Sequence, residues 1–221
     1  MSELGSVRLD AVMADDLSVV NSARISFAKH VTELTEADTA LINYLMRERH
    51  GTPFEHNAFR FHIRCPIFVA REWFRHRIGS FNEFSGRYSE FTPDAYIPPV
   101  EDIRTQTGKP GNYTYEQAEQ HVAIDARNRI EYAYKVAFDA YNHMLAQGVA
   151  KEIARTVIPV GAYTEFYWTV NARSLMNFVS LRTHETAQLE IRAFADRIEQ
   201  HFAQHMPITH EAFTKHGRRA P

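Results

Sequence analysis

The sequence predicts an α+β fold dominated by helices. Apolar residues recur with helical spacing over two long stretches, and they alternate with polar residues in a shorter one. The strand-like stretches do not alternate regularly with helices, which argues against a doubly wound parallel sheet. With 221 residues, the chain has the length of one large domain, and we predict a single domain over residues 1–221.

A long helix is predicted in the middle of the chain. Thr114, Glu116 and Gln117 belong to a stretch that matches a capping box, and Gly148 stands where a helix would end. Between them, apolar residues recur at steps of three or four: Ala118, Val122, Ala126, Ile130, Ala133, Ala137, Tyr141 and Met144. This spacing places them on one face of a helix.

Three further helices are predicted. One follows Thr35, with Asp38 as a capping partner, and ends near residues 51–53. Another spans residues 67–77 and runs into a basic end. The third lies near the C-terminus, where the helically spaced apolar residues are Ala187, Ile191, Phe194, Ile198 and Phe202.

Two strands and one long loop complete the prediction. Residues 59–64 alternate between apolar and basic side chains, and residues 162–170 are rich in Tyr, Thr, Phe, Trp and Val. Residues 92–112 contain several prolines and glycines, which favours a loop.

The composition excludes several classes of protein. Hydrophobic residues make up 44% of the chain and charged residues 24%, which is typical of globular proteins rather than disordered ones. The net charge of −2 argues against a polybasic nucleic-acid binder. Cys65 is the only cysteine, so no intramolecular disulfide can form, as is usual in a reducing compartment.

The chain also shows no sign of export or membrane insertion. No stretch approaches the roughly 18 consecutive apolar residues that a membrane span requires. Residues 1–16 lack a basic start followed by an apolar run, so they do not form a secretory signal. We therefore expect a cytoplasmic protein with no membrane partner.

The densest functional signal lies in residues 75–88, RHRIGSFNEFSGRY. This segment carries three guanidinium groups, two serine hydroxyls and one amide, which together suit a phosphate or a carbonyl-rich ring. Glu83 is its acidic member and can accept from a ligand or hold an arginine in place. A solvated basic loop is the plainer interpretation of the first three residues alone.

The full pattern resembles the signature of the flavin-dependent thymidylate synthases, R-H-R-x-x-S-x-N-E-x-S-x-R-Y. All of its fixed positions are present: Arg75, His76, Arg77, Ser80, Asn82, Glu83, Ser85, Arg87 and Tyr88. Further segments resemble the same family, namely residues 23–27, 50–56, 152–159 and 171–182. The resemblance implies a small antiparallel sheet flanked by long helices, and a homotetramer whose active sites are shared between subunits.

The resemblance also implies the reaction. Members of this family convert dUMP to dTMP, with methylenetetrahydrofolate as the carbon donor and NADPH as the reductant through FAD, and they release tetrahydrofolate. A fixed cation beside uracil stabilises negative charge on its carbonyl oxygens and N3. By family match Arg182 is that cation, and the catalytic set also contains Ser85, as a polar contact, and His50, near the flavin and folate.

Binding residues carry over from the family by position. The residues expected to bind FAD are Ser26, Thr52, Glu55, Arg75, His76, Arg77, Ile78, Asn82, Glu83, Asn171, Arg173, Asn177, Leu181 and Arg182. Those expected to bind the nucleotide are Glu72, Arg75, Glu83, Phe84, Ser85, Gly86, Arg87, Arg155 and Arg182.

Two positions depart from the family pattern. Glu72 stands where relatives often carry Gln, and a carboxylate near a phosphate is unfavourable unless Arg71 or Arg75 neutralises it. Thr186 stands where relatives often have a histidine, and His184 is a possible replacement. Cys65 shares strand parity with the apolar residues, so we expect a buried, inert thiol and no cysteine nucleophile.

Other patterns have plainer interpretations. His201 and His205 are spaced as neighbours on one helix face, but the chain has no HExxH or CxxC motif, and we expect no metal. Residues 60–77 carry a net charge of +4, which indicates either a solvated face or a field that attracts anionic ligands. The aromatic residues between Tyr163 and Trp168 fit a core or a subunit interface better than a stacking platform.

Two alternatives to an active synthase remain at this stage. A module that binds RNA or single-stranded nucleic acid would use the same arginine cluster together with nearby aromatic residues. A flavoprotein of this fold that has lost methyl transfer is the other, and only Glu72 and Thr186 favour it.

Overall fold

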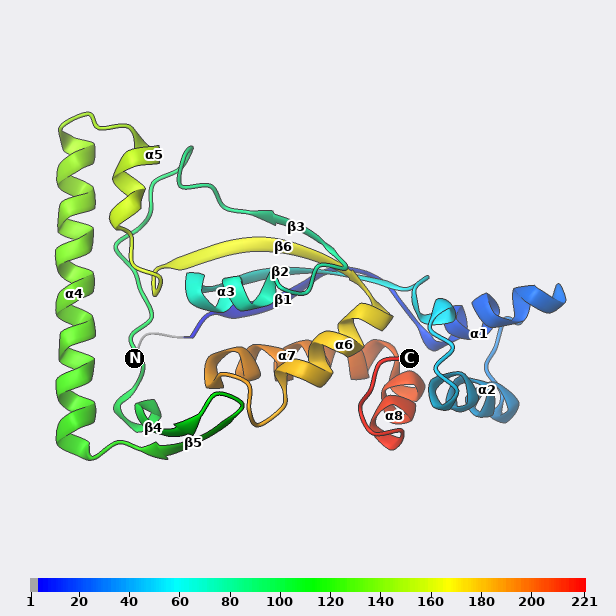
Figure 1. Ribbon diagram of the computed structural model, residues 1–221. Coiled ribbons are helices and arrows are strands. Elements are labelled where there is room, and N and C mark those ends of the chain that lie inside the picture. Colours follow the sequence, from blue (N-terminus) through cyan, green and yellow to red (C-terminus); the bar gives the residue numbers. More distant parts are fainter. Residues whose placement is uncertain (1–3) are drawn as a thin grey trace. The chain divides into compact units, whose positions relative to one another are not determined.

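The structure is a computed structural model that describes residues 4–221 (Figure 1). Its contacts divide the chain into two compact units. The described part of the first unit comprises residues 4–5, 65–68 and 84–164, and the second comprises residues 6–64, 69–83 and 165–221. The single domain over residues 1–221 stays a prediction, and residues 1–3, part of the stretch predicted to carry no secretory signal, lie outside the described residues.

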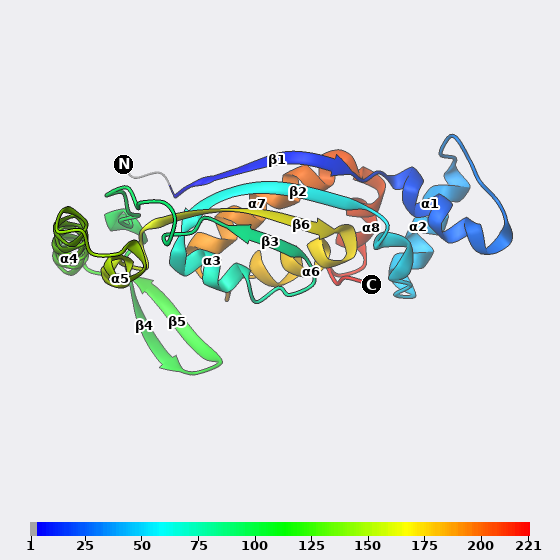
Figure 2. The same cartoon turned by 90° about the horizontal axis from the view of Figure 1, so that it is seen from above.

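A four-stranded sheet with the order β1-β2-β6-β3 forms the centre of the second unit (Figure 2). The strands are β1 (Ser6–Met13), β2 (Ala58–Pro66), β6 (Tyr163–Asn171) and β3 (Ser80–Glu83). β1 pairs antiparallel with β2, and β3 pairs antiparallel with β6. The α+β class and the two predicted strands are thus confirmed.

The period-two pattern of β2 separates a buried face from an exposed one. Phe59, Phe61 and Ile63 are fully buried, as are Cys65 and, across the sheet, Trp168. On the opposite face, polar and charged side chains pair with one another. One face of the sheet therefore belongs to the core, where Cys65 is buried as expected.

Helices cover the buried face of the sheet in the second unit (Figures 1 and 2). They are α3 (Ile67–Trp73), α6 (Ala172–Arg182) and α7 (Leu189–His205). The apolar residues predicted for α7 from Ile191 to Phe202 are buried, and His201 and His205 of the same helix contact the rings of Phe61 and Phe59.

A second group of helices in this unit comprises α1 (Asp16–Arg24), α2 (Glu36–Arg47) and α8 (Pro207–Lys215), with the short 3-10 helices η1 (Ile25–Phe27) and η2 (Thr52–Phe54). The predicted start of α2 is confirmed, because Thr35 and Asp38 form a reciprocal capping box. Asp38 is also buried and forms an ion pair with Arg24.

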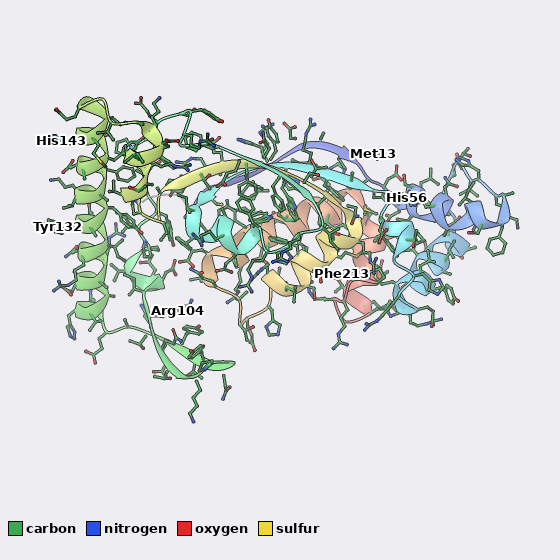
Figure 3. All side chains as sticks on the ribbon, turned by 45° about the horizontal axis from the view of Figure 1, so that its top comes forward. Met13, His56, Arg104, Tyr132, His143 and Phe213 are labelled. Atoms are coloured by element: carbon green, nitrogen blue, oxygen red, sulfur yellow. The ribbon has the colours of Figure 1, made fainter. Side chains whose placement is uncertain are left out.

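The first unit contains the long helix α4 (Gln120–Ala146), the short helix α5 (Lys151–Ala154) and a hairpin of β4 (Arg104–Lys109) and β5 (Asn112–Gln117). The 3-10 helices η3 (Val100–Asp102) and η4 (Arg155–Val157) complete it. Figure 3 shows Tyr132 and His143 on α4, and Arg104 at the start of the hairpin. Gly148 adopts a φ of 78° beyond the end of α4, which confirms its predicted role as a terminating residue.

Three local predictions are wrong. Thr114–Gln117 belong to β5 rather than to a capping box, because they pair with β4, and α4 begins at Gln120. Residues 92–112 are not one loop, since they contain η3, β4 and the turn to β5. The helix predicted over residues 67–77 ends at Trp73, after which the chain turns toward β3.

A buried carboxylate joins α1 to α8. Asp16 is 4% exposed, and its oxygens accept from the backbone N–H groups of Ile208 and Thr209, both at 2.9 Å, and from the Thr209 hydroxyl at 2.6 Å. These N–H groups belong to the first turn of α8, where they have no partner within the helix. Asp16 therefore caps a helix almost 200 residues away in the sequence.

We expect Asp16→Ala to lower the free energy of unfolding by about 2–4 kcal/mol, because it leaves the buried N–H group of Thr209 and the part-buried N–H group of Ile208 unsatisfied. Chemical denaturation monitored by circular dichroism measures this loss. Asp15→Ala is the control, since Asp15 caps only its own helix through Ser18, and a loss of about 1 kcal/mol is expected there. Equal losses in the two variants would contradict the long-range cap.

Candidate active site

The signature segment is divided between the two units. Residues 75–83 belong to the second unit and residues 84–88 to the first, so the residues predicted to bind FAD and those predicted to bind only the nucleotide fall largely on different units.

A pocket of about 850 Å³ lies in the second unit. Ten of the residues that the resemblance assigns to FAD line it: Glu55, Arg75, His76, Arg77, Ile78, Asn171, Arg173, Asn177, Leu181 and Arg182. Four arginines and one glutamate among them give the lining a net charge of +3. The pocket therefore suits a large anionic ligand.

Helix α6 supplies one wall of this pocket because its two faces differ. Arg173, Asn177 and Leu181 are four residues apart, so they share one face, which lines the pocket. Leu175 and Val179 belong to the opposite face and are fully buried. Asn171 caps the helix by accepting from the Ser174 amide at 2.8 Å, which fixes where this wall begins.

Arg182 sits at the end of α6 in a network of hydrogen bonds. Its Nε donates to His76 Nε2 at 2.9 Å. Its two terminal nitrogens donate to the Glu72 carboxylate and to the Glu72 backbone carbonyl, each at 3.2 Å. The Arg182 side chain is only 19% exposed, so this cation is held in one place and partly shielded from water.

The neighbours of Arg182 have shifted pKa values. Burial, reinforced by the positive charges of Arg182 and Arg75, lowers the pKa of His76 to about 4. Burial also raises the pKa of Glu72, although Arg182 opposes this shift. His76 is therefore neutral near pH 7, and its Nε2 lone pair accepts the hydrogen bond from Arg182.

The C-terminal segment forms part of the pocket, which the sequence did not indicate. Ala220 and Pro221 line it, and the backbone oxygen of Pro221 accepts from Arg173 Nε at 2.6 Å. Arg173 also pairs with Glu55 across the pocket. No spacing pattern connects residues so far apart. Ser174 also lines the pocket; it belongs to the segment over residues 171–182 that resembles the family, but it was not assigned to FAD.

Arg218 anchors this C-terminal segment. Its terminal nitrogens donate to both carboxylate oxygens of Glu199, at 2.8 and 2.6 Å, and one of them also donates to the Thr183 hydroxyl at 3.2 Å. Thr183 directly follows Arg182, so the anchor ties the pocket wall to the end of α6. Burial acts to raise the pKa of Glu199, but hydrogen bonds from Arg218 and His210 outweigh it and hold this pKa below its usual value.

Several residues assigned to FAD do not line this pocket. Ser26 and Thr52 lie on η1 and η2, and Asn82 and Glu83 lie on β3, where they pair with Tyr167 and Phe166 of β6. His50 is exposed beside the ring of Tyr44, with 5.6 Å between the ring centroids, and does not line the pocket either. The roles of all five stay predictions.

The residues predicted to bind the nucleotide, Phe84, Ser85, Gly86 and Arg87, lie in and just before a turn in the first unit, and Arg155 lies at the start of η4. The Ser85 carbonyl accepts from the Tyr88 and Ser89 amides, each at 3.0 Å, and its hydroxyl accepts from the Arg87 amide at 3.4 Å. Arg87 and Arg155 are exposed. Two accessible guanidinium groups suit a phosphate.

The two departures from the family pattern have different surroundings. Glu72 is neutralised by Arg182, with Arg75 contributing, rather than by Arg71. The Thr186 hydroxyl lies 2.8 Å from His184 Nδ1, so these two side chains bond to each other, and neither lines the pocket.

The remaining sequence candidates contribute little to the pocket. Arg60 and Arg64 of the basic span are paired with Asp10 and Glu165, at 2.7 and 3.8 Å, so they form a salt-bridged sheet face. No three His, Cys, Asp or Glu side chains within residues 4–221 come together as a possible metal site. None of the helices in this described range has the length and apolar character needed to cross a membrane.

Comparison with known proteins identifies the family. The family model described as Thy1, thymidylate synthase complementing protein, matches residues 8–208. The flavin-dependent thymidylate synthase of Thermotoga neapolitana is 45% identical over 213 residues, which cover 96% of this chain and 92% of that protein. The enzyme of the same name from Streptomyces coelicolor is 46% identical over 98% of this chain and 93% of its own. The chain belongs to the flavin-dependent thymidylate synthase family.

Solved structures extend this agreement to the fold. The UMP/dUMP methylase PolB from Streptomyces cacaoi, bound with 5-Br dUMP, superposes with a TM-score of 0.92 at 43% identity. The match covers 100% of this chain and 98% of PolB, and a second PolB structure, bound with 5-Br UMP, matches equally well. The small antiparallel sheet with long helices is thus the architecture of a flavin-dependent thymidylate synthase.

We expect the neutral state of His76 to make stability depend on pH. The folded-state pKa is about 4 and the unfolded value is near 6.5, so the unfolded chain takes up the proton first. This contribution is fully present above pH 6.5 and is lost as the pH falls to about 4. After allowance for solvent screening it amounts to about 1–2 kcal/mol.

Denaturation at a series of pH values measures this loss, and histidine NMR reports the His76 pKa directly. His76→Gln is the control, since glutamine keeps an acceptor for Arg182 but does not titrate. A His76 resonance that titrates near pH 6.5 would contradict the assignment of a neutral acceptor.

We expect Glu72→Gln to bind dUMP at least as tightly as the wild type, with a melting temperature that is no lower. Glutamine still offers Arg182 an oxygen acceptor, and it removes a half-buried carboxylate whose pKa is raised by burial. Calorimetric titration with dUMP tests this expectation. A tenfold loss of dUMP affinity in Glu72→Gln would show that the carboxylate itself is needed. Glu72→Ala removes both the charge and the hydrogen bond, so comparing the two variants separates these effects.

Proposed function

We propose that this enzyme methylates C5 of dUMP to form dTMP, with methylenetetrahydrofolate as the carbon donor and NADPH as the reductant through bound FAD. Tetrahydrofolate is the second product. Membership of a family named for flavin-dependent thymidylate synthesis supports the reaction. The complete signature supports the assignment of the site. Such a nucleotide-synthesising enzyme belongs in the cytoplasm.

The observation that carries the proposal is the immobilised cation at the end of α6. C5 of uracil becomes nucleophilic only when negative charge is stabilised on the ring oxygens and N3. Arg182 is held by His76 and Glu72, so its guanidinium needs no reorganisation before the reaction. Because His76 is neutral, it holds the guanidinium through a hydrogen bond without placing a second positive charge beside it, which favours this role.

The pocket residues fit a flavin dinucleotide. Its two phosphates require cations, which Arg75, Arg77 and Arg173 offer, and its ring requires apolar surface, which the exposed side chains of Ile78 and Leu181 offer. When bound, the flavin supplies the hydride chemistry of the reaction, and the protein supplies binding, orientation and electrostatics. The backbone oxygen of Pro221 holds Arg173 at one edge of this space.

The remaining roles follow the family positions. Arg75, Arg87 and Arg155 bind the nucleotide, chiefly its phosphate, and Ser85 contributes a polar contact. Cys65 is fully buried among apolar side chains, which supports a mechanism without a cysteine nucleophile.

A homotetramer with shared active sites is part of the proposal. Helix α4 exposes apolar side chains along its length, including Val122, Ile124 and Val136, and both strands of the β4–β5 hairpin are exposed throughout. Exposed apolar residues on a long helix favour contact with further copies of the chain.

Release of tritium from [5-³H]dUMP tests the reaction. The purified protein is assayed with FAD, NADPH and methylenetetrahydrofolate, and each component is omitted in turn. Release that requires every component supports the proposal. A parallel assay with [5-³H]UMP decides between the two nucleotides named for PolB. Binding of FAD and dUMP without release would favour a flavoprotein that has lost methyl transfer, and binding of oligonucleotides alone would favour a nucleic-acid module.

We expect Arg182→Ala to fold and to bind FAD normally or weakly, while kcat falls by a factor of about 10² or more, because a preorganised charge is lost. Single-turnover formation of dTMP measures the chemical step. Arg47→Ala is the control, since Arg47 is an exposed α2 residue paired only with its neighbour Glu48 in the described ion pairs. Turnover of Arg182→Ala near that of the wild type would remove Arg182 from the catalytic role.

A further inference from the structure

The turn that carries the nucleotide residues is exposed on one side and tied down on the other. Arg87 and Tyr88 are exposed, whereas Gly86 is buried. Within the turn, only the short-range bonds to the Ser85 carbonyl and hydroxyl hold the backbone. A turn of this kind keeps one shape only if further contacts from outside it restrict its motion.

Phe91 provides the first of these contacts. A Cβ atom at Gly86 would lie 2.4 Å from the Phe91 ring, so this ring rests directly on the glycine backbone. The same ring meets Phe84 edge to face, with 5.1 Å between the centroids. Phe91 therefore packs against both the start and the middle of the turn.

Tyr141 of α4 holds Phe91 in place. Tyr141 is fully buried, and its hydroxyl accepts from the Phe91 backbone N–H at 3.1 Å. The two rings also meet edge to face at 6.3 Å. Because α4 is the longest helix of the first unit, this bond ties the turn to its most extended element.

Lys151 at the start of α5 makes a second connection. Its ammonium group donates to the Tyr88 carbonyl at 3.3 Å and pairs with Glu90 at 3.1 Å. This charge-assisted bond reaches Tyr88, the last residue of the signature. Lys151 itself lies four residues before Arg155 in the chain. Lys151 thus links the turn to the segment that carries a second predicted phosphate ligand.

We propose that Phe91, Tyr141 and Lys151 are positioning residues that hold residues 85–88 in the shape that binds the nucleotide phosphate. None of the three belongs to the signature. The inference rests on the proposed function, which assigns Ser85, Gly86 and Arg87 to the nucleotide. A turn held in its binding shape before the ligand arrives loses less conformational entropy on binding, and this raises affinity.

Tyr141→Phe tests the proposal because it removes a single hydroxyl group. We expect the Kd and KM for dUMP to rise about fivefold, with FAD affinity and kcat at saturating dUMP within twofold of the wild type. Bound dUMP restores the shape of the turn, so KM changes and kcat does not. Tyr132→Phe is the matched control, because Tyr132 lies on the same helix and is 71% exposed.

Lys151→Met provides the second variant, and Lys151→Arg provides the conservative replacement. Methionine keeps the apolar stem but cannot bond to Tyr88, so we expect a similar rise in KM, which arginine reverses. This variant carries the test if Tyr141→Phe does not fold, since Lys151 is partly exposed. Calorimetric titration of the FAD-loaded enzyme with dUMP and steady-state kinetics supply the measurements.

The proposal is overturned if dUMP affinity is unchanged in both variants. It is also overturned if FAD affinity, kcat and melting temperature fall together with dUMP affinity, since that pattern indicates a general loss of structure. Failure of the wild type to bind dUMP would remove the proposed function and this inference together. Wild-type binding with unaltered variants would remove the inference alone.

Discussion

The packing of Trp73 is the interaction on which the second unit depends. Its ring is fully buried and stacks on Phe178 of α6 with 4.7 Å between the centroids. It also meets Trp168 of β6 and Phe194 of α7 edge to face, at 5.4 and 5.9 Å. One side chain therefore sets the positions of α3, β6, α6 and α7 relative to one another.

The polar network at the pocket is built directly on this aromatic cluster. Glu72 precedes Trp73 in the chain, and Arg182 lies one helical turn after Phe178. His76 packs against Phe178, with 4.9 Å between the ring centroids, so one side of its imidazole faces an apolar surface. The same burial that fixes these side chains keeps the imidazole neutral, and packing and electrostatics at the site thus have a common cause.

The sequence predicted the parts of the fold that follow short-range rules. The periodicity of β2, the apolar face of α7 and the capping box of α2 depend on neighbouring residues, and each is confirmed. Pairing of β5 with β4 overrode a capping-box match, because two hairpin strands satisfied their backbone groups together. The hairpin was hidden by prolines and glycines that equally well describe a loop.

The site shows the same division. Motif positions identified the residues of α6 and of the basic segment that line the pocket, since each motif lies within one continuous stretch of the chain. The contributions of Pro221 and Arg218 depend on contacts between distant segments. No local pattern marks such residues, and only the three-dimensional arrangement reveals them.

The capping of α8 by Asp16 has a consequence for the order of events during folding. The bond joins residues 193 positions apart, and the second unit contains segments on both sides of residues 84–164. On the ribosome, β1 and α1 emerge long before their partner in α8 exists, while most of the first unit is already synthesised. Closing so large a loop costs conformational entropy before the stabilising contacts between its ends have formed. We therefore expect the second unit to form last and slowly.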